Sequence, residues 1–80
     1  ETLGVEISVS AYDRRGLLRD LTDVVAAERL SIDAVNSRTD HESGIAHFAL
    51  SIPVADLEQL ARLLRRLAGV ANVIEARRRG

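Results

Sequence analysis

A change of period within residues 5–25, VEISVSAYDRRGLLRDLTDVV, decides the fold. Apolar and polar residues alternate over residues 5–12, which predicts a strand with one buried face. From Leu17 the apolar residues recur at helical spacing and fall within an arc of about 120° on a helical wheel. The residues on this arc are Leu17, Leu18, Leu21, Val24 and Val25. The stretch therefore predicts a strand, a short turn and an amphipathic helix that ends near Ala27 or Glu28.

The turn between this strand and this helix, Asp13-Arg14-Arg15-Gly16, is the strongest local feature of the chain. Aspartate is a favoured helix N-cap, so we expect the Asp13 carboxylate to accept a hydrogen bond from the Gly16 N–H. Free N–H groups at a helix N-terminus also attract carboxylates and other anions, and a glycine lets a ligand approach closely. The residues alone leave two interpretations open: a turn that only caps the helix, or a binding site.

The middle of the chain predicts a β-hairpin. Residues 30–39 alternate at first and then become polar, which suits a strand at an exposed sheet edge. Gly44 can take the positive φ that a turn requires. Alternation over residues 45–52 predicts a third strand in the centre of the sheet, and Pro53 is expected to end it.

A second amphipathic helix follows the hairpin. Asp56 and Gln59 have the spacing of a capping box and mark its start. Leucine and alanine fill one broad face over residues 57–68, and arginine and glutamate hold the other. Gly69 is expected to be the left-handed residue that follows the helix.

The final segment, residues 70–77, is β-like, although its pattern does not decide whether Val73 or Ile74 faces inward. The element order is therefore β-α-β-β-α-β, the pattern of an α+β, ferredoxin-like sandwich. We expect an antiparallel sheet in the order 4-1-3-2, with both helices on one face and right-handed crossovers. This fold serves many unrelated functions, so it does not decide the function by itself.

The composition fits one small folded domain over residues 1–80. Apolar residues make up 46% and charged residues 29%, which excludes a disordered chain. There is no cysteine, which excludes a disulfide framework and fits a reducing cytoplasm. A net charge of −1 gives no general attraction to nucleic acid, and no apolar run is long enough to span a membrane. Because the chain begins at Glu1 without a methionine, we expect it to be an excised piece of a longer protein.

No group of residues points to catalysis or to a metal site in this chain. There is no cysteine nucleophile, and no serine lies in a nucleophile-elbow context. His41 lies in the predicted turn and His47 on an outward strand face. Asp40, His41 and Glu42 are adjacent, and adjacent residues rarely converge on one metal ion. We therefore expect no enzyme activity, no metal and no cofactor in this chain.

The basic residues are all arginine, and they gather on the second helix and at the end of the chain. Such stripes contact phosphates in nucleic-acid-binding proteins, whereas a merely solvated helix face is the alternative. Base stacking needs aromatic side chains on the sheet, and this sheet offers His47 and Tyr12 but no aromatic pair like that of RNA-binding modules of similar topology. The candidate RNA contacts are Arg62, Arg66, Arg77 and Arg78.

Three segments resemble one known family. Residues 13–22, DRRGLLRDLT, are similar to the opening of ACT domains in RelA/SpoT-type (p)ppGpp synthetases. Residues 36–40, NSRTD, resemble the second strand of these domains, and residues 73–78, VIEARR, resemble their last strand in the form closer to the RelA type. The resemblance covers the chain from about Val5 to Arg78.

This resemblance implies a regulatory role. Members of the family make (p)ppGpp by transferring pyrophosphate from ATP to GTP or GDP, with active sites in an N-terminal part that this chain lacks. Their C-terminal ACT domain is linked to the sensing of amino-acid starvation on the ribosome. Other ACT domains bind amino acids at a dimer interface, through the first β–α turn and the second strand. Carried onto this sequence, the candidate site is Asp13, Arg14, Arg15, Gly16 and Leu17, with Asn36 and Ser37 nearby.

The sequence therefore predicts a regulatory ACT domain from the C-terminal part of a GTP pyrophosphokinase. The expected partners are the ribosome and its RNA, other domains of the parent protein, and a second copy paired through the second-strand edge. No membrane contact is expected. The alternative is an amino-acid-binding ACT sensor of another metabolic enzyme. Arg15 stands where other ACT domains often have proline, and it puts a second long cation at the mouth of such a site.

Overall fold

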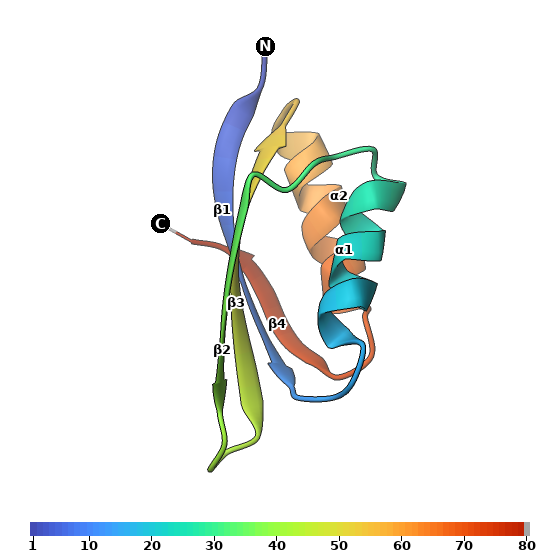
Figure 1. Ribbon diagram of the computed structural model, residues 1–80. Helices are drawn as coiled ribbons and strands as arrows, with labels where there is room; N and C mark the ends of the chain where they lie inside the picture. Colours follow the sequence, from blue (N-terminus) through green and yellow to red (C-terminus); the bar gives the residue numbers. More distant parts are fainter. Residues whose placement is uncertain (80) are drawn as a thin grey trace.

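The computed structural model describes residues 1–79 and has six regular elements (Figure 1). They are β1 (Leu3–Tyr12), α1 (Leu17–Ala27), β2 (Ala34–Asp40), β3 (Ile45–Val54), α2 (Leu57–Ala68) and β4 (Val73–Arg78). The four strands form one sheet in the order β2-β3-β1-β4, and every neighbouring pair is antiparallel. The predicted element order and sheet order are both confirmed.

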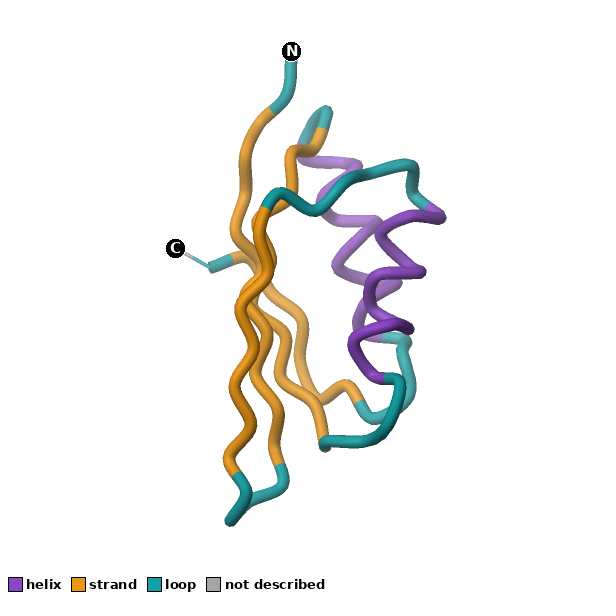
Figure 2. The backbone as a smooth tube through the Cα atoms, viewed as in Figure 1, coloured by secondary structure: helices purple, strands orange, loops and turns teal. Residues whose placement is uncertain are grey.

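The two helices form a layer on one face of the sheet (Figure 2). Between the layers lies a core of aliphatic side chains with one phenylalanine, because alternate residues of β1 and β3 point toward the helices. Burial of one such side chain contributes about 1.5–3 kcal/mol. The largest fully buried side chains are those of Ile7, Leu21, Leu50, Ile52, Leu63, Leu67, Val9, Val25 and Val54. The core therefore joins both helices to the two central strands.

The opposite face of the sheet, which we call the outer face, carries the small and polar residues of the alternation. Ser8 and Ser10 of β1 lie beside Ala49 and His47 of β3 in the strand register. The register continues into β2, where Arg38 is level with His47. Both helices lie on the other side, so no element of the described chain covers this face (Figure 1).

β2 is an edge strand, as its polar sequence predicted, but it begins later than expected. Leu30 and Ile32 lie in the connection from α1, which crosses from the helix layer to the sheet (Figure 2). They pack against the core without pairing in the sheet. The physical reason lies at Arg29, whose positive φ of 60° turns the chain directly after the helix. The prediction of a strand from residue 30 was therefore wrong by four residues.

Pro53 does not end β3, which continues to Val54. The Ser51 carbonyl oxygen accepts a hydrogen bond from the Asp33 N–H, so this side of β3 faces β2. The backbone N–H and C=O groups of successive strand residues point to alternate sides, so the backbone of residue 53 also points toward the β2 side. The β2–β3 pairing ends at Ala34, which pairs with Ser51, so β2 has no residue opposite Pro53. The missing N–H of proline therefore costs no sheet hydrogen bond there.

The start of α2 agrees with the prediction, whereas the left-handed residue after this helix lies elsewhere than predicted. The Asp56 carboxylate accepts a hydrogen bond from the Gln59 N–H at 2.8 Å, as the capping-box spacing predicted. The expected left-handed residue after α2 is not Gly69, whose φ is −83°. Asn72 takes that conformation instead, with a φ of 78°. The chain therefore reverses three residues later than expected.

A β-bulge decides the orientation of β4. Ala11 pairs with Val73 and Ser10 pairs with Glu75, which leaves Ile74 as the extra residue. Val73 packs against the core, whereas the Ile74 side chain is 48% exposed. The question that the sequence left open is thus settled by an irregularity in the pairing.

Candidate functional site

The turn between β1 and α1 is built around Gly16. This residue is the N-cap of α1 with a φ of 79°, and no side chain caps the helix. The expected cap at Asp13 was wrong, because the chain turns at Gly16, directly before the first helical residue. The Asp13 N–H instead donates to the Gly44 carbonyl oxygen at 2.8 Å, which continues the β1–β3 pairing by one bond.

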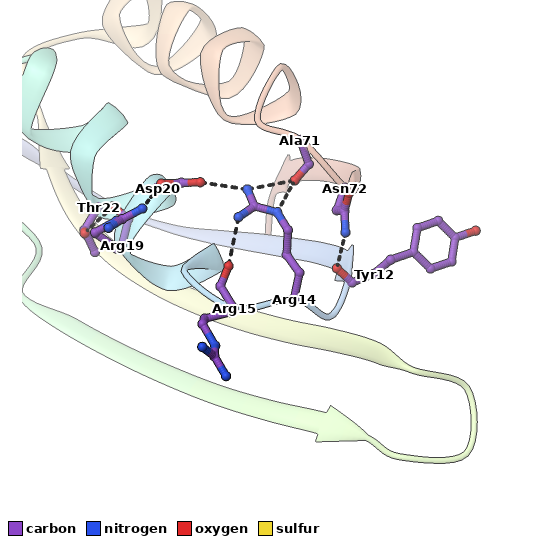
Figure 3. A network of polar contacts seen from close by, with 8 residues as sticks. All are labelled: Tyr12, Arg14, Arg15, Arg19, Asp20, Thr22, Ala71 and Asn72. Atoms are coloured by element: carbon purple, nitrogen blue, oxygen red, sulfur yellow. Dashed lines mark hydrogen bonds and ion pairs between the residues drawn. The ribbon is translucent and has the colours of Figure 1, made fainter.

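Arg14 is the centre of a polar network at this turn (Figure 3). Its guanidinium donates to the Asp20 carboxylate at 2.8 Å and to the Ala71 carbonyl oxygen at 3.2 Å. A third bond reaches the Arg15 carbonyl oxygen at 3.2 Å. Arg14 therefore ties the β1–α1 turn to the α2–β4 connection. A side chain held by three groups of its own chain is a positioning element rather than a free ligand contact.

Asp20 is the acidic member of this network, and the sequence did not mark it. The hydrogen bond from Arg14 holds the pKa of the Asp20 carboxyl below its ordinary value, and the charges of Arg14 and Arg19 act in the same direction. Its signals in the sequence are its place in the segment of residues 13–22 and its position in the first helical turn, which also suits the helix dipole. The carboxylate therefore stays charged in mildly acidic solution and keeps Arg14 in place.

The other predicted residues of the turn have different surroundings. The Arg15 side chain points away from the network and is exposed (Figure 3). The side chain of Leu17 belongs to the core and is 2% exposed, so it anchors the helix. Asp13 is exposed. Among these residues, Asp13 and Arg15 are therefore the ones with a side chain available to a partner.

Asn36 and Ser37 lie on β2, away from the turn in the strand register. Asn36 pairs with Ala49, which in turn pairs with Ser8, whereas the turn starts only after Tyr12. Ser37 pairs with Phe48 and so faces the helix side of the sheet. Within one chain, the structure therefore does not bring these two residues together with the turn.

Asn36 instead borders a hollow of about 430 Å³ on the outer face. The floor is made by the small residues Ser8 and Ala49, which are neighbours in the register. Longer side chains stand around it, among them Arg38, His47 and Arg79. Sequence analysis placed His47 on an outward face but did not connect it with Arg38 and Arg79, because only the cross-strand register does so.

The candidate RNA contacts on α2 are engaged within the chain. Arg62 donates to the Glu28 carboxylate at 2.9 Å, and Arg66 donates to its second oxygen. The hydrogen bonds from Arg66 and then Arg62 hold the pKa of Glu28 below its ordinary value. At the chain end, Arg77 pairs with Glu75 at 3.2 Å. The bonds to Glu28 join the end of α1 to α2. Three of the four candidate arginines are thus paired with carboxylates of the same chain.

Comparison with known proteins gives the family. The family model described as "ACT domain" matches residues 1–78. The chain belongs to the ACT domain family. The resemblance noted in residues 13–22 is thereby confirmed over nearly the whole length of the chain.

The curated relatives of this ACT domain are named GTP pyrophosphokinase. The relative from Haemophilus influenzae is 42% identical over 74 residues, which is 92% of this chain. The relative from Escherichia coli K12 is 40% identical over 72 residues, or 90% of this chain. In both cases the ACT domain spans about 10% of the length of the relative. These relatives are thus much longer proteins that contain a segment of this kind.

Solved structures agree in fold. The crystal structure of the ACT domain from a GTP pyrophosphokinase of Chlorobium tepidum has a TM-score of 0.84 and 22% identity, covering 99% of this chain and 100% of that one. A homoserine dehydrogenase from Thiobacillus denitrificans has a TM-score of 0.79 and 19% identity, covering 98% of this chain and 17% of that one. The same fold therefore occurs in enzymes of different activity.

Two further properties of this ACT domain bear on its chemistry. No helix within residues 1–79 has the length and apolar character needed to cross a membrane. In the same residues, no three side chains among His, Cys, Asp and Glu gather as a metal ion would require.

Proposed function

We propose that this ACT domain is a regulatory module of a RelA/SpoT-type GTP pyrophosphokinase and controls (p)ppGpp synthesis in response to amino-acid starvation. The observation that carries the proposal is the identity of 40–42% with relatives named GTP pyrophosphokinase, spread over at least 90% of this chain. On this proposal the chain is the C-terminal domain of a longer cytoplasmic enzyme. It acts through contacts with the ribosome, with other domains of that enzyme, or with a second copy.

The free edge of β2 supports pairing with a second copy. The odd-numbered residues of β3 direct their backbone N–H and C=O groups toward β2, as the hydrogen bond from the Asp33 N–H to the Ser51 carbonyl oxygen shows. The even-numbered β2 residues therefore form the sheet bonds, and the odd ones turn their backbone groups to solvent. The residues with free edge groups are Val35, Ser37 and Thr39. A second β2 added at this edge would extend the sheet and satisfy these groups.

Amino-acid sensing is the alternative function, and it has less support. The Arg14 side chain is held by three groups of its own chain, and Leu17 is packed in the core. Only Asp13 and Arg15 offer free side chains at the turn. Calorimetric titration of the domain with single amino acids at millimolar concentration tests this alternative, and heat of binding for one of them would favour it.

The functional test uses the parent enzyme that contains this chain. Cells carrying the enzyme without its ACT domain are compared with cells carrying the intact enzyme, before and after amino-acid starvation. We expect both kinds of cell to make (p)ppGpp. On starvation, its level should rise much more strongly in cells with the intact enzyme than in cells without the ACT domain, or in the former alone. An unchanged response without the domain would reject the proposal. The Arg65→Gln enzyme is the control, because Arg65 is exposed and forms no ion pair within residues 1–79.

A further inference from the structure

The hollow on the outer face has the composition of an anion site. On the outer face its lining contains two guanidiniums, one imidazole, an amide and one hydroxyl, and no carboxylate from the described residues. The side chains of this lining that lie on the outer face are those of Ser8, Asn36, Arg38, His47, Ala49 and Arg79. Groups of this kind donate hydrogen bonds, and guanidinium matches the geometry of a phosphate.

The two arginines of the hollow are free, whereas most candidate RNA contacts are engaged. Within residues 1–79, neither Arg38 nor Arg79 takes part in an ion pair. Among the described residues, no carboxylate therefore pairs with these two guanidiniums. Arg77, the neighbour of Ser8 in the register, is instead paired with Glu75.

Within residues 1–79, the acidic residues near the hollow form no ion pair with these arginines. The Asp40 carboxylate accepts the Glu42 N–H at 3.0 Å, so it is used by its own turn. This bond is the main reason why the pKa of Asp40 lies below its ordinary value, although the charge of Arg38 also lowers this pKa. Glu6 accepts a bond from the Arg79 N–H through its backbone oxygen, but its carboxylate makes no ion pair with Arg79. The guanidiniums therefore remain available to an anion from outside.

The geometry also explains why there is room for a ligand. Ser8 and Ala49 are the residues directly opposite each other at the floor, and both are small. Arg38 reaches in from β2 and Arg79 from the end of β4, so the charges stand on opposite sides of the floor. We propose that this hollow is a phosphate-binding site, which takes either a phosphate of an RNA backbone or that of a free nucleotide.

This site differs from the turn between β1 and α1 and from the arginines of α2. It does not depend on the proposed regulatory role, because binding is measured on residues 1–80 alone. The absence of a stacking aromatic pair on the sheet fits contacts to phosphate rather than sequence-specific contacts to bases.

The test is an NMR titration of the ¹⁵N-labelled chain with three probes: inorganic phosphate, GTP and a single-stranded RNA oligonucleotide. We expect saturable shifts of the backbone signals of Ser8, His47 and Ala49 with at least one probe. Shifts with RNA alone identify a nucleic-acid backbone as the source of the phosphate. Shifts with GTP or inorganic phosphate identify a free ligand.

Two arginine variants and one control make the test specific. Arg38→Gln and Arg79→Gln are each expected to weaken binding about tenfold, the usual effect of losing a charge-assisted hydrogen bond. With RNA, each is also expected to lower the slope of log K against log salt by about 0.7. Arg65→Gln removes the same charge from α2 and is expected to leave binding unchanged.

A variant of the floor checks the site independently of the arginines. Ala49→Glu places a carboxylate in the hollow and is expected to abolish binding, while the dispersion of the NMR spectrum shows that the fold is kept. The proposal is overturned if no probe gives saturable shifts at the hollow in the millimolar range. It is equally overturned if Arg65→Gln weakens binding as much as Arg38→Gln does.

Discussion

The guanidinium of Arg14 and the carboxylate of Asp20 lie 2.8 Å apart, and the same guanidinium donates to the carbonyl oxygen of Ala71. One side chain thus joins the start of α1 to the connection that leads into β4. These segments are far apart in the sequence and come together at one end of the sheet (Figure 3). The Arg14 network therefore fixes the turn that sequence analysis singled out as a candidate site for a ligand or a partner.

Replacing Arg14 is expected to destabilise the domain. Arg14→Gln removes the bonds to the Ala71 carbonyl, and a hydrogen bond of this kind contributes about 0.5–1.5 kcal/mol. Urea denaturation followed by circular dichroism measures the change in the free energy of unfolding. Arg15→Gln is the matched control, because its side chain is exposed and lies outside the network. Equal stability of the two variants would contradict the role given to Arg14.

Replacing Gly16 is expected to destabilise the domain through the backbone conformation of this residue. Gly16→Ala forces a left-handed φ of 79° on a residue with a Cβ, which costs about 1 kcal/mol or more. The contact itself is mild, since the nearest atom is a flexible Arg19 nitrogen at 3.4 Å. Gly4→Ala is the control, because a Cβ there meets nothing within 4 Å. Thermal unfolding should show a lower midpoint for Gly16→Ala only.

Acidic pH is expected to destabilise the domain through Glu28. The arginines of α2 hold the pKa of Glu28 below 4.5, the ordinary value that it regains in the unfolded chain. The folded state therefore binds fewer protons than the unfolded state in this range. The stabilisation is complete above pH 4.5 and is lost as the pH falls through the lower pKa of the folded state.

Stability curves between neutral and acidic pH measure this effect. Glu28→Gln should show a weaker loss of stability on acidification than the unmodified chain, because it has no carboxylate to protonate. Glu58→Gln is the control, since Glu58 is exposed and forms no ion pair within residues 1–79. Identical pH dependence of Glu28→Gln and the unmodified chain would refute the assignment.

Core and edge positions are expected to respond differently to truncation. Leu50 is 0% exposed in the centre of the sheet, so Leu50→Ala should cost about 2–5 kcal/mol. Val35 on the edge strand is 48% exposed, and Val35→Ala should change the stability of the monomer by about 0.5 kcal/mol or less. Chemical denaturation at low protein concentration measures both. A large loss in Val35→Ala under these conditions would show that β2 is covered.

The free edge of β2 gives a test of self-association. Ser37→Pro removes an N–H that faces solvent rather than β3, so the sheet within one chain keeps its bonds. If two copies pair through this edge, Ser37→Pro should sediment as a monomer at concentrations where Ser37→Ala forms a dimer. Sedimentation velocity over a range of concentrations provides the measurement. A clean monomer for the unmodified chain at high concentration would reject the pairing.

The sequence by itself determined the elements and their order, because an apolar period of two or 3.6 residues follows directly from which face of a strand or helix is buried. It also determined the edge position of β2, whose polar residues had no place in a core. The resemblance of residues 13–22 pointed to the ACT family through local identity, without the need for coordinates.

Only the tertiary structure decided which distant side chains meet. Arg14 reaches Ala71, and Glu28 meets Arg62, because the ends of separate elements are packed together. Likewise, the register of β1, β2 and β3 brings Arg38 to the hollow above Ser8 and Ala49, which Arg79 also lines. A local period carries no information about register or about the reach of a long side chain, since both depend on contacts between residues far apart in the chain.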